Sequence, residues 1–341
     1  MKKEIQILST FDLSKEQQEQ LRQASEGVKL TVIPTSDPAA IPAERWAEAE
    51  VLYTWDVLPA PDQAPNLKWV QLGSVGVDPY LTLPLLQRED LLFTSMSGAI
   101  VSQIAEYVLM ALLAFGHKLP KLMRDQADHR WAPPQELWQN YLPMELRHST
   151  VGILGYGSIG RQVARLLQPF GATVLAAKRD VMNPEDEGYI PEGMGDPHGD
   201  FFTRLYPIEA LHGLLSASDF VVVTLPLTDE TRHILDAQAF DAMKETAYLV
   251  NVGRGALVDE AALVAALKAK KLAGAALDVF EQEPLPEDSP LWDFENVILS
   301  PHLSGFSRYM HDEALTLFEE NLNRYVAGLP LYNQVDLKKG Y

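Results

Sequence analysis

The chain has 341 residues, carries a formal net charge of −19 and contains no cysteine. Its length predicts two domains, because a single core rarely grows beyond ~300 residues. The acidity argues against nucleic acid or an anionic membrane as a partner, and the lack of cysteine excludes disulfides, thiol catalysis and thiolate metal sites. Residues 1–4 lead into a strand-like run without the apolar core of a signal peptide, and no apolar run reaches the ~20 residues that span a bilayer. We therefore expect a soluble, cytoplasmic protein, and we assign no metal site.

The first hundred residues alternate strand-like runs with helical or loop segments. Ser14, with Gln17 three residues later, forms a capping-box pattern for a helix that ends near Ser25. Strands separated by crossover segments indicate a small parallel α/β domain. The strand-like runs cover residues 5–9, 29–33, 51–55, 69–72 and 91–94.

A glycine-containing loop follows the fourth of these runs. Loops at the carboxyl ends of parallel strands form the ligand crevice of such sheets, so the backbone N–H groups of Ser74, Val75 and Gly76 could hold a carboxylate. A plain glycine turn explains the same residues equally well. Trp55, at the end of the third run, could form a wall of this pocket or lie in the core.

Near the middle of the chain, a strand-like run ends in the motif Gly-Tyr-Gly-Ser-Ile-Gly and leads into a helical pattern. In such a motif Gly155 permits a tight turn, Gly157 lets the backbone approach a pyrophosphate, and Gly160 lets helix and strand pack closely. The amides at the start of the helix, from Ser158 and Ile159 onward, favour an anion. We therefore predict a dinucleotide site here.

Further strand-like runs predict a doubly wound sheet from about residue 148 to 301. Residues 180–200 are rich in glycine, proline and acid without periodicity, which indicates a long surface insertion. The strands are expected at 173–177, 220–225, 247–251, 274–279 and 297–300, a loop at 131–134, and helices at 102–113, 120–130, 207–217, 260–270 and 308–327.

Three polar residues, Arg254, Glu283 and His302, follow consecutive strands of this sheet. Because parallel strands end at one edge, the three side chains are expected to meet. The guanidinium of Arg254 suits a carboxylate or a carbonyl oxygen, and a carboxylate beside His302 would raise its pKa above the usual ~6.5 and fix its tautomer. A protonated histidine beside an arginine is what reduction of a 2-keto acid requires, since hydride reaches carbon while a proton reaches oxygen. Taken singly, Arg254 could instead cap a loop, Glu283 could be a solvated carboxylate, and His302 could be a surface histidine.

With these residues in place, the chain resembles the D-isomer-specific 2-hydroxyacid dehydrogenases over nearly its whole length. The resemblance implies a Rossmann dinucleotide-binding domain, residues 101–304, inserted into a flavodoxin-like parallel-sheet substrate domain formed by residues 1–100 and 305–341. It rests on four motifs in order: Gly-Tyr-Gly-Ser-Ile-Gly at 155–160, Asn-Val-Gly-Arg-Gly-Ala-Leu-Val-Asp at 251–259, Leu-Asp-Val-Phe-Glu-Gln-Glu-Pro at 277–284 and Ser-Pro-His at 300–302.

The resemblance also implies a role for each residue of the site. Arg254 would bind the substrate carboxylate and carbonyl, His302 would be the general acid/base, and Glu283 would be its partner. The amides of Val75 and Gly76 match those that hold the substrate carboxylate. The implied cofactor residues are Asp278 near the nicotinamide carboxamide, Leu225 and Pro226 near the nicotinamide ribose, and the turn of Asn251, Val252 and Gly253.

The same resemblance implies that the substrate is a 2-keto or D-2-hydroxy acid of the glyoxylate/hydroxypyruvate kind. Glu283 points away from the related formate-oxidising enzymes, which carry glutamine there. No regulatory domain like that of the longer phosphoglycerate dehydrogenases is expected. In glyoxylate/hydroxypyruvate reductases a nearby arginine helps to bind the carboxylate, which makes Arg308 a candidate.

The choice of cofactor depends on the end of the second strand of the nucleotide-binding domain. NAD enzymes place an acid there to bind the adenosine ribose hydroxyls. This chain has Lys178 and Arg179, and its first acid, Asp180, comes two residues late. Two cations suit a 2′-phosphate, so we predict NADP in preference to NAD. Alternatively, Lys178 points to solvent and Asp180 reaches the ribose.

Trp131 and Trp138 lie in a segment that often contacts the partner subunit in this family, so we expect a homodimer through the nucleotide-binding domain. A rival interpretation is a cofactor-sensing binding protein, because some relatives act as transcriptional corepressors. Intact Arg254, Glu283 and His302 do not exclude that rival.

Overall fold

The computed structural model describes residues 4–341, which divide into two compact units. The first unit comprises the described residues up to Ile100 together with Ser307–Tyr341, and the second comprises Val101–Phe306. Both ends of the chain therefore belong to one unit, and the other unit is inserted into it. The second break falls two residues after the predicted position at 304.

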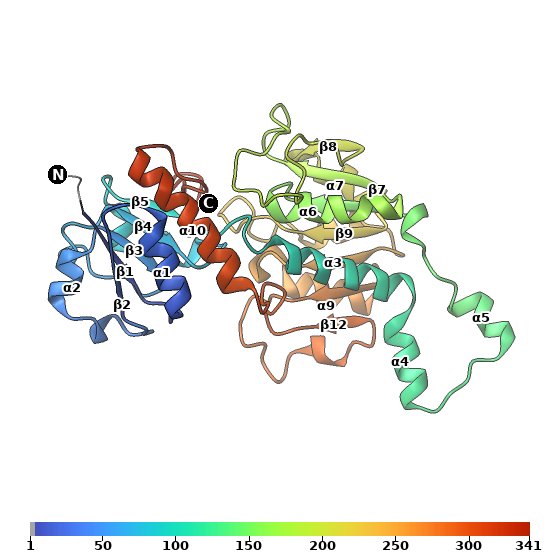
Figure 1. The fold of residues 1–341 in the computed structure, drawn as a ribbon. Coiled ribbons are helices and arrows are strands. Elements are labelled where there is room, and N and C mark those ends of the chain that lie inside the picture. The colour runs from blue at the N-terminus through green and yellow to red at the C-terminus, as the bar shows by residue number, and fades with distance from the viewer. Residues whose placement is uncertain (1–3) are drawn as a thin grey trace. The chain divides into compact units, whose positions relative to one another are not determined.

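The first unit is built on a five-stranded parallel sheet in the order β2-β1-β3-β4-β5, the flavodoxin-like order (Figure 1). One face of this sheet packs against the long C-terminal helix. There the ring centroid of Phe318 lies 4.3 Å from that of Tyr53, on which it stacks, and 5.3 Å from that of Trp69. The buried Trp46 lies in the cluster on the other face. The elements are β1 Ile5–Ser9, α1 Lys15–Ala24, β2 Val28–Val32, α2 Ala43–Glu48, β3 Val51–Thr54, β4 Trp69–Leu72, β5 Leu92–Thr94 and α10 Met310–Ala327.

The second unit is built on a seven-stranded parallel sheet in the order β12-β11-β10-β9-β6-β7-β8. The chain runs outward from β6 first through β7 and β8 and then, on the other side, through β9 to β12, so the strand order reverses beside β6. A ligand crevice is expected outside the carboxyl ends of the strands at such a reversal.

Helices cover both faces of this sheet. One face carries α3 and α6, which contact each other, and the other carries the neighbouring helices α7, α8 and α9 (Figure 1). The elements are α3 Val101–Gly116, α4 Leu119–Ala127, α5 Pro134–Asn140, β6 Thr150–Leu154, α6 Ser158–Leu167, β7 Thr173–Lys178, β8 Arg204–Pro207, α7 Leu211–Ala217, β9 Phe220–Val223, α8 Ala237–Ala242, β10 Tyr248–Asn251, α9 Glu260–Lys268, β11 Gly274–Leu277 and β12 Val297–Leu299.

Most element predictions are confirmed. The capping box of Ser14 and Gln17 is present at α1, and helix α10 ends at Gly328 with a left-handed φ of 68°. The helix expected from residue 207 begins only at Leu211, because Arg204–Pro207 forms the edge strand β8. Strand β8 is short and half exposed, so it has no alternating pattern. Helix α5 was not predicted because it buries none of its residues and lacks an apolar stripe. Within residues 4–341, none of the helices combines the length and apolar character needed to cross a membrane.

Candidate active site

The glycine motif joins β6 to α6 in a shape that leaves room for a phosphate group. Gly155 has a φ of +103°, and a side chain there would come within 2.8 Å of the Leu225 amide nitrogen. A Cβ on Gly160 would lie 2.2 Å from the Gly155 carbonyl oxygen, so helix and turn touch. A Cβ on the exposed Gly157 would meet nothing within 4 Å. The backbone is thus open where a pyrophosphate would approach, and the N-cap residue Gly157 has no side chain to cap the first turn of α6, which begins at this point.

The loop after β9 is tied to this turn. The Thr224 hydroxyl donates to the Gly155 carbonyl oxygen at 2.7 Å, and the Thr231 hydroxyl donates to the Pro226 carbonyl oxygen at 2.7 Å. These bonds hold Leu225 and Pro226 beside the glycine turn.

The turn after β10 is shaped by the buried Asn251. Its amide oxygen accepts from the Gly253 N–H at 3.1 Å, and its amide nitrogen donates to the Arg254 carbonyl oxygen at 3.0 Å. The Val252 amide donates to the Val223 carbonyl oxygen at 3.2 Å, which joins the turn to β9. The half-buried Arg254 donates from Nη1 to the Gly253 carbonyl oxygen at 2.9 Å. The side chain of Asn251 therefore fixes the backbone from which the guanidinium projects.

Gly255 brings this turn against the loop that carries Glu283. A Cβ on Gly255 would lie 1.8 Å from the Phe280 carbonyl carbon and 2.4 Å from the Glu281 nitrogen. Only glycine permits so close a contact between the two backbones. The arginine turn and the glutamate loop are therefore packed as one piece at the carboxyl edge of the sheet.

His302 and Glu283 form a pair at the same edge. Nδ1 of His302 lies 2.8 Å from Oε2 of Glu283, and both side chains are partly exposed. The other carboxylate oxygen, Oε1, accepts from the Phe280 N–H at 3.0 Å. His302 has a left-handed φ of 51°. With Nδ1 directed to the carboxylate, Nε2 is the ring nitrogen that remains for proton exchange with a bound substrate.

Asp278 holds the loop of His302. Its side chain is completely buried and accepts from the Ser300 hydroxyl at 2.6 Å and from the Leu303 and Ser304 N–H groups at 2.9 Å each. Its carbonyl oxygen accepts from the His302 N–H at 2.8 Å. A buried carboxylate with three donors is stable only in this loop conformation. Sequence reasoning assigned Asp278 to the cofactor and missed this structural role.

A second residue that the sequence analysis missed supports this loop from helix α3. The Ser300 hydroxyl uses its hydrogen for the bond to Asp278. The Tyr107 hydroxyl, 2.6 Å from the Ser300 oxygen, is therefore the donor in the bond between Tyr107 and Ser300. Burial raises the pKa of Tyr107, which keeps this donor protonated. Ser300, whose hydroxyl bonds to Asp278, is the sequence signal that a side chain supports this loop, but nothing in the sequence pairs Ser300 with Tyr107.

At the other end of the crevice, β7 ends at Lys178. Its ammonium group donates to the carbonyl oxygens of Asn183 at 2.5 Å and Glu185 at 3.4 Å, and Arg179 pairs with Glu230 at 2.9 Å. The Lys178 side chain therefore lies against the segment that follows β7. The carboxylate of Asp180 accepts from the Met182 N–H and the Asn183 amide. Asp180 closes its own turn rather than reaching outward.

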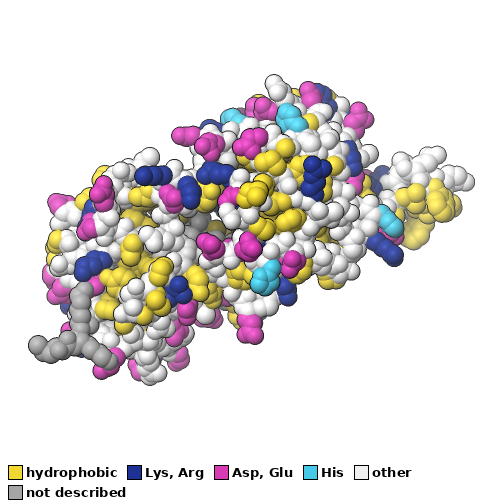
Figure 2. All heavy atoms as spheres, turned by 90° about the horizontal axis from the view of Figure 1, so that it is seen from above, with side chains coloured by type: hydrophobic (Ala, Val, Ile, Leu, Met, Phe, Trp, Pro, Cys, Tyr) yellow, Lys and Arg dark blue, Asp and Glu magenta, His cyan; other side chains and the backbone are white. Residues whose placement is uncertain are grey.

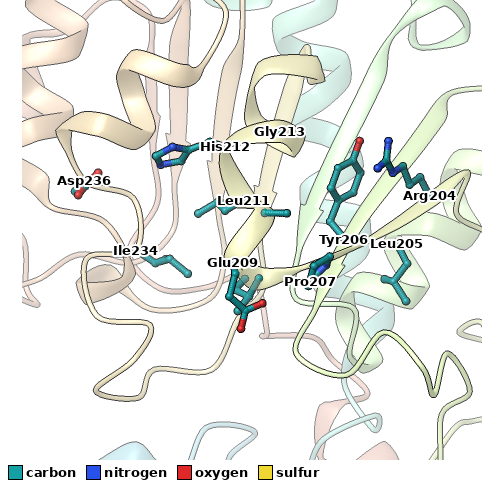
Figure 3. Close-up of a pocket in the computed structure, with 12 residues that line it drawn as sticks. Arg204, Leu205, Tyr206, Pro207, Glu209, Leu211, His212, Gly213, Ile234 and Asp236 are labelled. Carbon is teal, nitrogen blue, oxygen red and sulfur yellow. The ribbon is translucent and has the colours of Figure 1, made fainter.

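A cavity of about 850 Å³ lies next to this strand end. It is bounded by β8, the start of α7 and the loop before α8 (Figure 3). Pro207, at the end of β8, is the register partner of Lys178, so the cavity opens beside it. Its apolar walls include Ile208, Leu211 and Ile234. Sequence reasoning missed this cavity because β8 was not predicted.

Two of the substrate candidates of the first unit, Trp55 and the loop of residues 74–76, lie next to each other. Trp55 is 37% exposed, so it is not a core residue, and its ring would lie 2.9 Å from a Cβ on Gly73. It therefore borders the loop of residues 74–76, in which the Ser74 hydroxyl donates to the Gly76 carbonyl oxygen at 3.0 Å. Arg308 is exposed just before α10. Among residues 4–341, no group of three or more His, Asp or Glu side chains is arranged to hold a metal ion.

Comparison with known proteins identifies the family. The model of the D-isomer specific 2-hydroxyacid dehydrogenase NAD binding domain matches residues 109–304. A glyoxylate reductase of Aeropyrum pernix is 35% identical over 295 residues, which are 82% of this chain and 81% of that one.

Solved structures agree over almost the whole chain. A D-isomer specific 2-hydroxyacid dehydrogenase from Xanthobacter autotrophicus in complex with NADPH and MES has 30% identity and a TM-score of 0.80, covering 99% of both chains. An NADPH-dependent glyoxylate/hydroxypyruvate reductase from Sinorhizobium meliloti in complex with NADP and sulfate has 28% identity and a TM-score of 0.77, covering 99% of this chain and 100% of that one. The chain therefore belongs to the D-isomer specific 2-hydroxyacid dehydrogenase family of NAD(P)-binding oxidoreductases.

Proposed function

We propose that the protein reduces a small 2-keto acid of the glyoxylate/hydroxypyruvate kind to the D-2-hydroxy acid, with NADPH as the preferred cofactor. The observation that carries this proposal is the His302–Glu283 pair, at 2.8 Å, on the sheet edge that also carries the Arg254 turn and the glycine motif. A proton donor and a guanidinium on the edge where a dinucleotide fits are the groups that keto-acid reduction needs.

Each catalytic residue has a distinct task in this proposal. The bound cofactor supplies hydride to the carbonyl carbon. Arg254 binds the carboxylate and carbonyl of the substrate and polarises the carbonyl. His302 donates a proton from Nε2 to the carbonyl oxygen, and Glu283 holds Nδ1 and stabilises the protonated ring. The amides of residues 74–76, the ring of Trp55 and the guanidinium of Arg308 are proposed as further substrate contacts.

The cofactor preference is argued from the end of β7. An NAD enzyme needs a carboxylate there for the ribose hydroxyls, whereas this chain offers Lys178 and Arg179, and Asp180 is engaged in its own turn. The cavity beside Pro207 has both apolar and polar lining residues, which suits the adenine ring. Asn251, Val252, Gly253 and Asp278 are proposed to line the nicotinamide end.

The purified enzyme should oxidise NADPH in the presence of glyoxylate or hydroxypyruvate, and faster than it oxidises NADH at equal concentration. The measurement is kcat/KM for both cofactors against a panel of 2-keto acids with and without a second carboxylate. A higher kcat/KM with NADH would show that the interpretation of Lys178 and Arg179 is wrong. Tight cofactor binding without turnover on any keto acid would instead favour the cofactor-sensing alternative.

We also propose that the protein forms a homodimer through helices α4 and α5. These helices form an arm that extends from the rest of the nucleotide-binding unit (Figure 1), and hydrophobic side chains gather on it (Figure 2). Trp131 is 95% exposed, Trp138 76% and Met123 61%. Several large apolar side chains exposed together on one arm mark a protein interface. A second copy of the same arm is the simplest symmetric partner.

Replacing Trp131 and Trp138 by serine should convert the protein from dimer to monomer at micromolar concentration, because large aromatic side chains dominate interface energies. The measurement is molar mass by light scattering during size-exclusion chromatography. Met182→Ser is the matched control, since Met182 is also exposed, at 83%, in the same unit but in the segment that follows the carboxyl end of β7. A wild-type monomer, or a double variant that stays dimeric, contradicts the proposal.

A further inference from the structure

A buried arginine holds the inserted segment that follows β7. Arg161, in helix α6, is only 1% exposed. It donates from Nη1 to the Asp196 carbonyl oxygen at 2.5 Å, and from Nη2 to those of Pro184 at 2.5 Å and Glu185 at 3.0 Å. Its Nε lies 3.3 Å from the Asp186 carboxylate. A guanidinium is buried at great cost unless such partners compensate for the lost water, so the segment is fixed rather than loose.

The cofactor motif itself takes part in this anchor. Tyr156, between the first two glycines, donates from its hydroxyl to Asp196 Oδ2 at 2.6 Å, and its ring lies 4.8 Å from the Arg161 guanidinium. Asp196 is 1% exposed and also accepts from the N–H groups of Asp200 at 2.8 Å and Phe201 at 3.0 Å. The three side chains thus join the glycine turn to the middle of the segment. The prediction of a surface insertion is confirmed for most of residues 180–200, of which only Gly195 and Asp196 are buried.

The same segment holds Lys178. The Glu185 carbonyl oxygen accepts from Arg161 and from Lys178, and the Asn183 carbonyl oxygen accepts from Lys178 at 2.5 Å. Burial lowers the pKa of Lys178, and the positive charge of Arg161 lowers it further. The position of the Lys178 ammonium therefore follows the position of residues 183–185, which in turn follows Arg161.

We propose that Arg161, Tyr156 and Asp196 are positioning residues for cofactor selection, because they fix the carbonyl groups that hold Lys178 at the end of β7. The inference rests on the proposed cofactor site, in which this ammonium lies at the adenosine ribose. A fixed ammonium binds a 2′-phosphate without first losing side-chain entropy. Once the anchor is removed, Lys178 loses its acceptors and becomes mobile. Recognition of the 2′-phosphate weakens, while contacts to the rest of the dinucleotide persist.

The test compares the ratio of kcat/KM for NADPH to that for NADH in three variants. Arg161→Met should raise the KM for NADPH and so lower this ratio by about fivefold or more. A change of this size is expected when one partly exposed charge contact, here that of Lys178 with the 2′-phosphate, is weakened. Tyr156→Phe removes only the hydroxyl donor and should lower it by about two- to threefold. Lys244→Met is the matched control, because it removes a cation that bonds to Ala217 and Asp219 at the opposite edge of the sheet.

The control should keep the ratio within about twofold of wild type, as surface substitutions usually do. An unchanged ratio in Arg161→Met, including equal losses of kcat/KM with both cofactors, would overturn the inference, because it shows that the anchor serves folding alone. A higher ratio would also overturn it, because it shows that the anchor keeps Lys178 away from the 2′-phosphate. If Arg161→Met does not fold, as judged by its thermal melt, Tyr156→Phe and Asp196→Asn decide by the same ratio. A wild-type preference for NADH would contradict the proposed cofactor, yet the variants would still have to lower the ratio.

Discussion

Replacing His302 by alanine should lower kcat for keto-acid reduction by about 10²–10⁴-fold, the usual contribution of a positioned general acid. The physical reason is that the carbonyl oxygen would then take its proton from water. The variant should still bind cofactor, because the glycine motif and the loop after β9 are held by bonds that do not involve His302. Turnover is measured by loss of nicotinamide absorbance, and cofactor affinity by fluorescence titration.

The control for this variant is His233→Ala. His233 also has a left-handed φ, of 52°, and its Nε2 lies 2.9 Å from a glutamate oxygen, that of Glu281. It matches His302 in backbone conformation and in partner but has no role in the proposed chemistry. Its kcat should stay within about fivefold of wild type, the scale of an exposed ion pair. Unchanged turnover in His302→Ala, or an equal loss in both variants, would remove His302 from the mechanism.

The architecture could be predicted because it is encoded locally. Apolar runs of four to six residues, spaced for crossover helices, are a sufficient signal for parallel strands, and the caps at Ser14 and Gly328 depend on neighbouring residues. Strand β8 exists only through pairing with β7, from Leu175↔Arg204 to Lys178↔Pro207. Its own residues carry no periodic pattern, so tertiary context decides its conformation.

The candidate site also contains residues that local sequence predicts and residues whose role depends on distant contacts. Arg254, Glu283 and His302 could be named from motifs, because each follows a strand and the edge of a parallel sheet gathers such residues. Asp278 could be named from its motif but its structural role could not be predicted, and the sequence does not single out Arg161 at all. Most of their partners are backbone N–H and carbonyl groups, as far as 35 positions away in the chain, and such groups leave no mark on side-chain identity. Close backbone contacts, such as that of Gly255 with Phe280, are equally invisible in sequence.

Arg254 offers the second large effect. Arg254→Met should raise the KM for the keto acid and lower kcat/KM by about 10²–10⁴-fold, since hydrogen bonds to charged groups contribute roughly 1.5–3 kcal/mol each and the planar fork makes two. The turn itself should survive, because Asn251 and the contact at Gly255 shape it through the backbone. The thermal melt and the affinity for cofactor should therefore change little.

Two further measurements separate binding of the substrate from a general disturbance. Arg254→Lys keeps the charge but loses the bidentate geometry, so its kcat/KM should lie between those of the wild type and Arg254→Met. Added guanidinium ion should restore part of the activity of Arg254→Ala, because truncation of the side chain at Cβ leaves space for the ion, and should not restore that of His302→Ala. If guanidinium restores neither variant and Arg254→Lys equals wild type, charge at this position suffices and the carboxylate fork is not used.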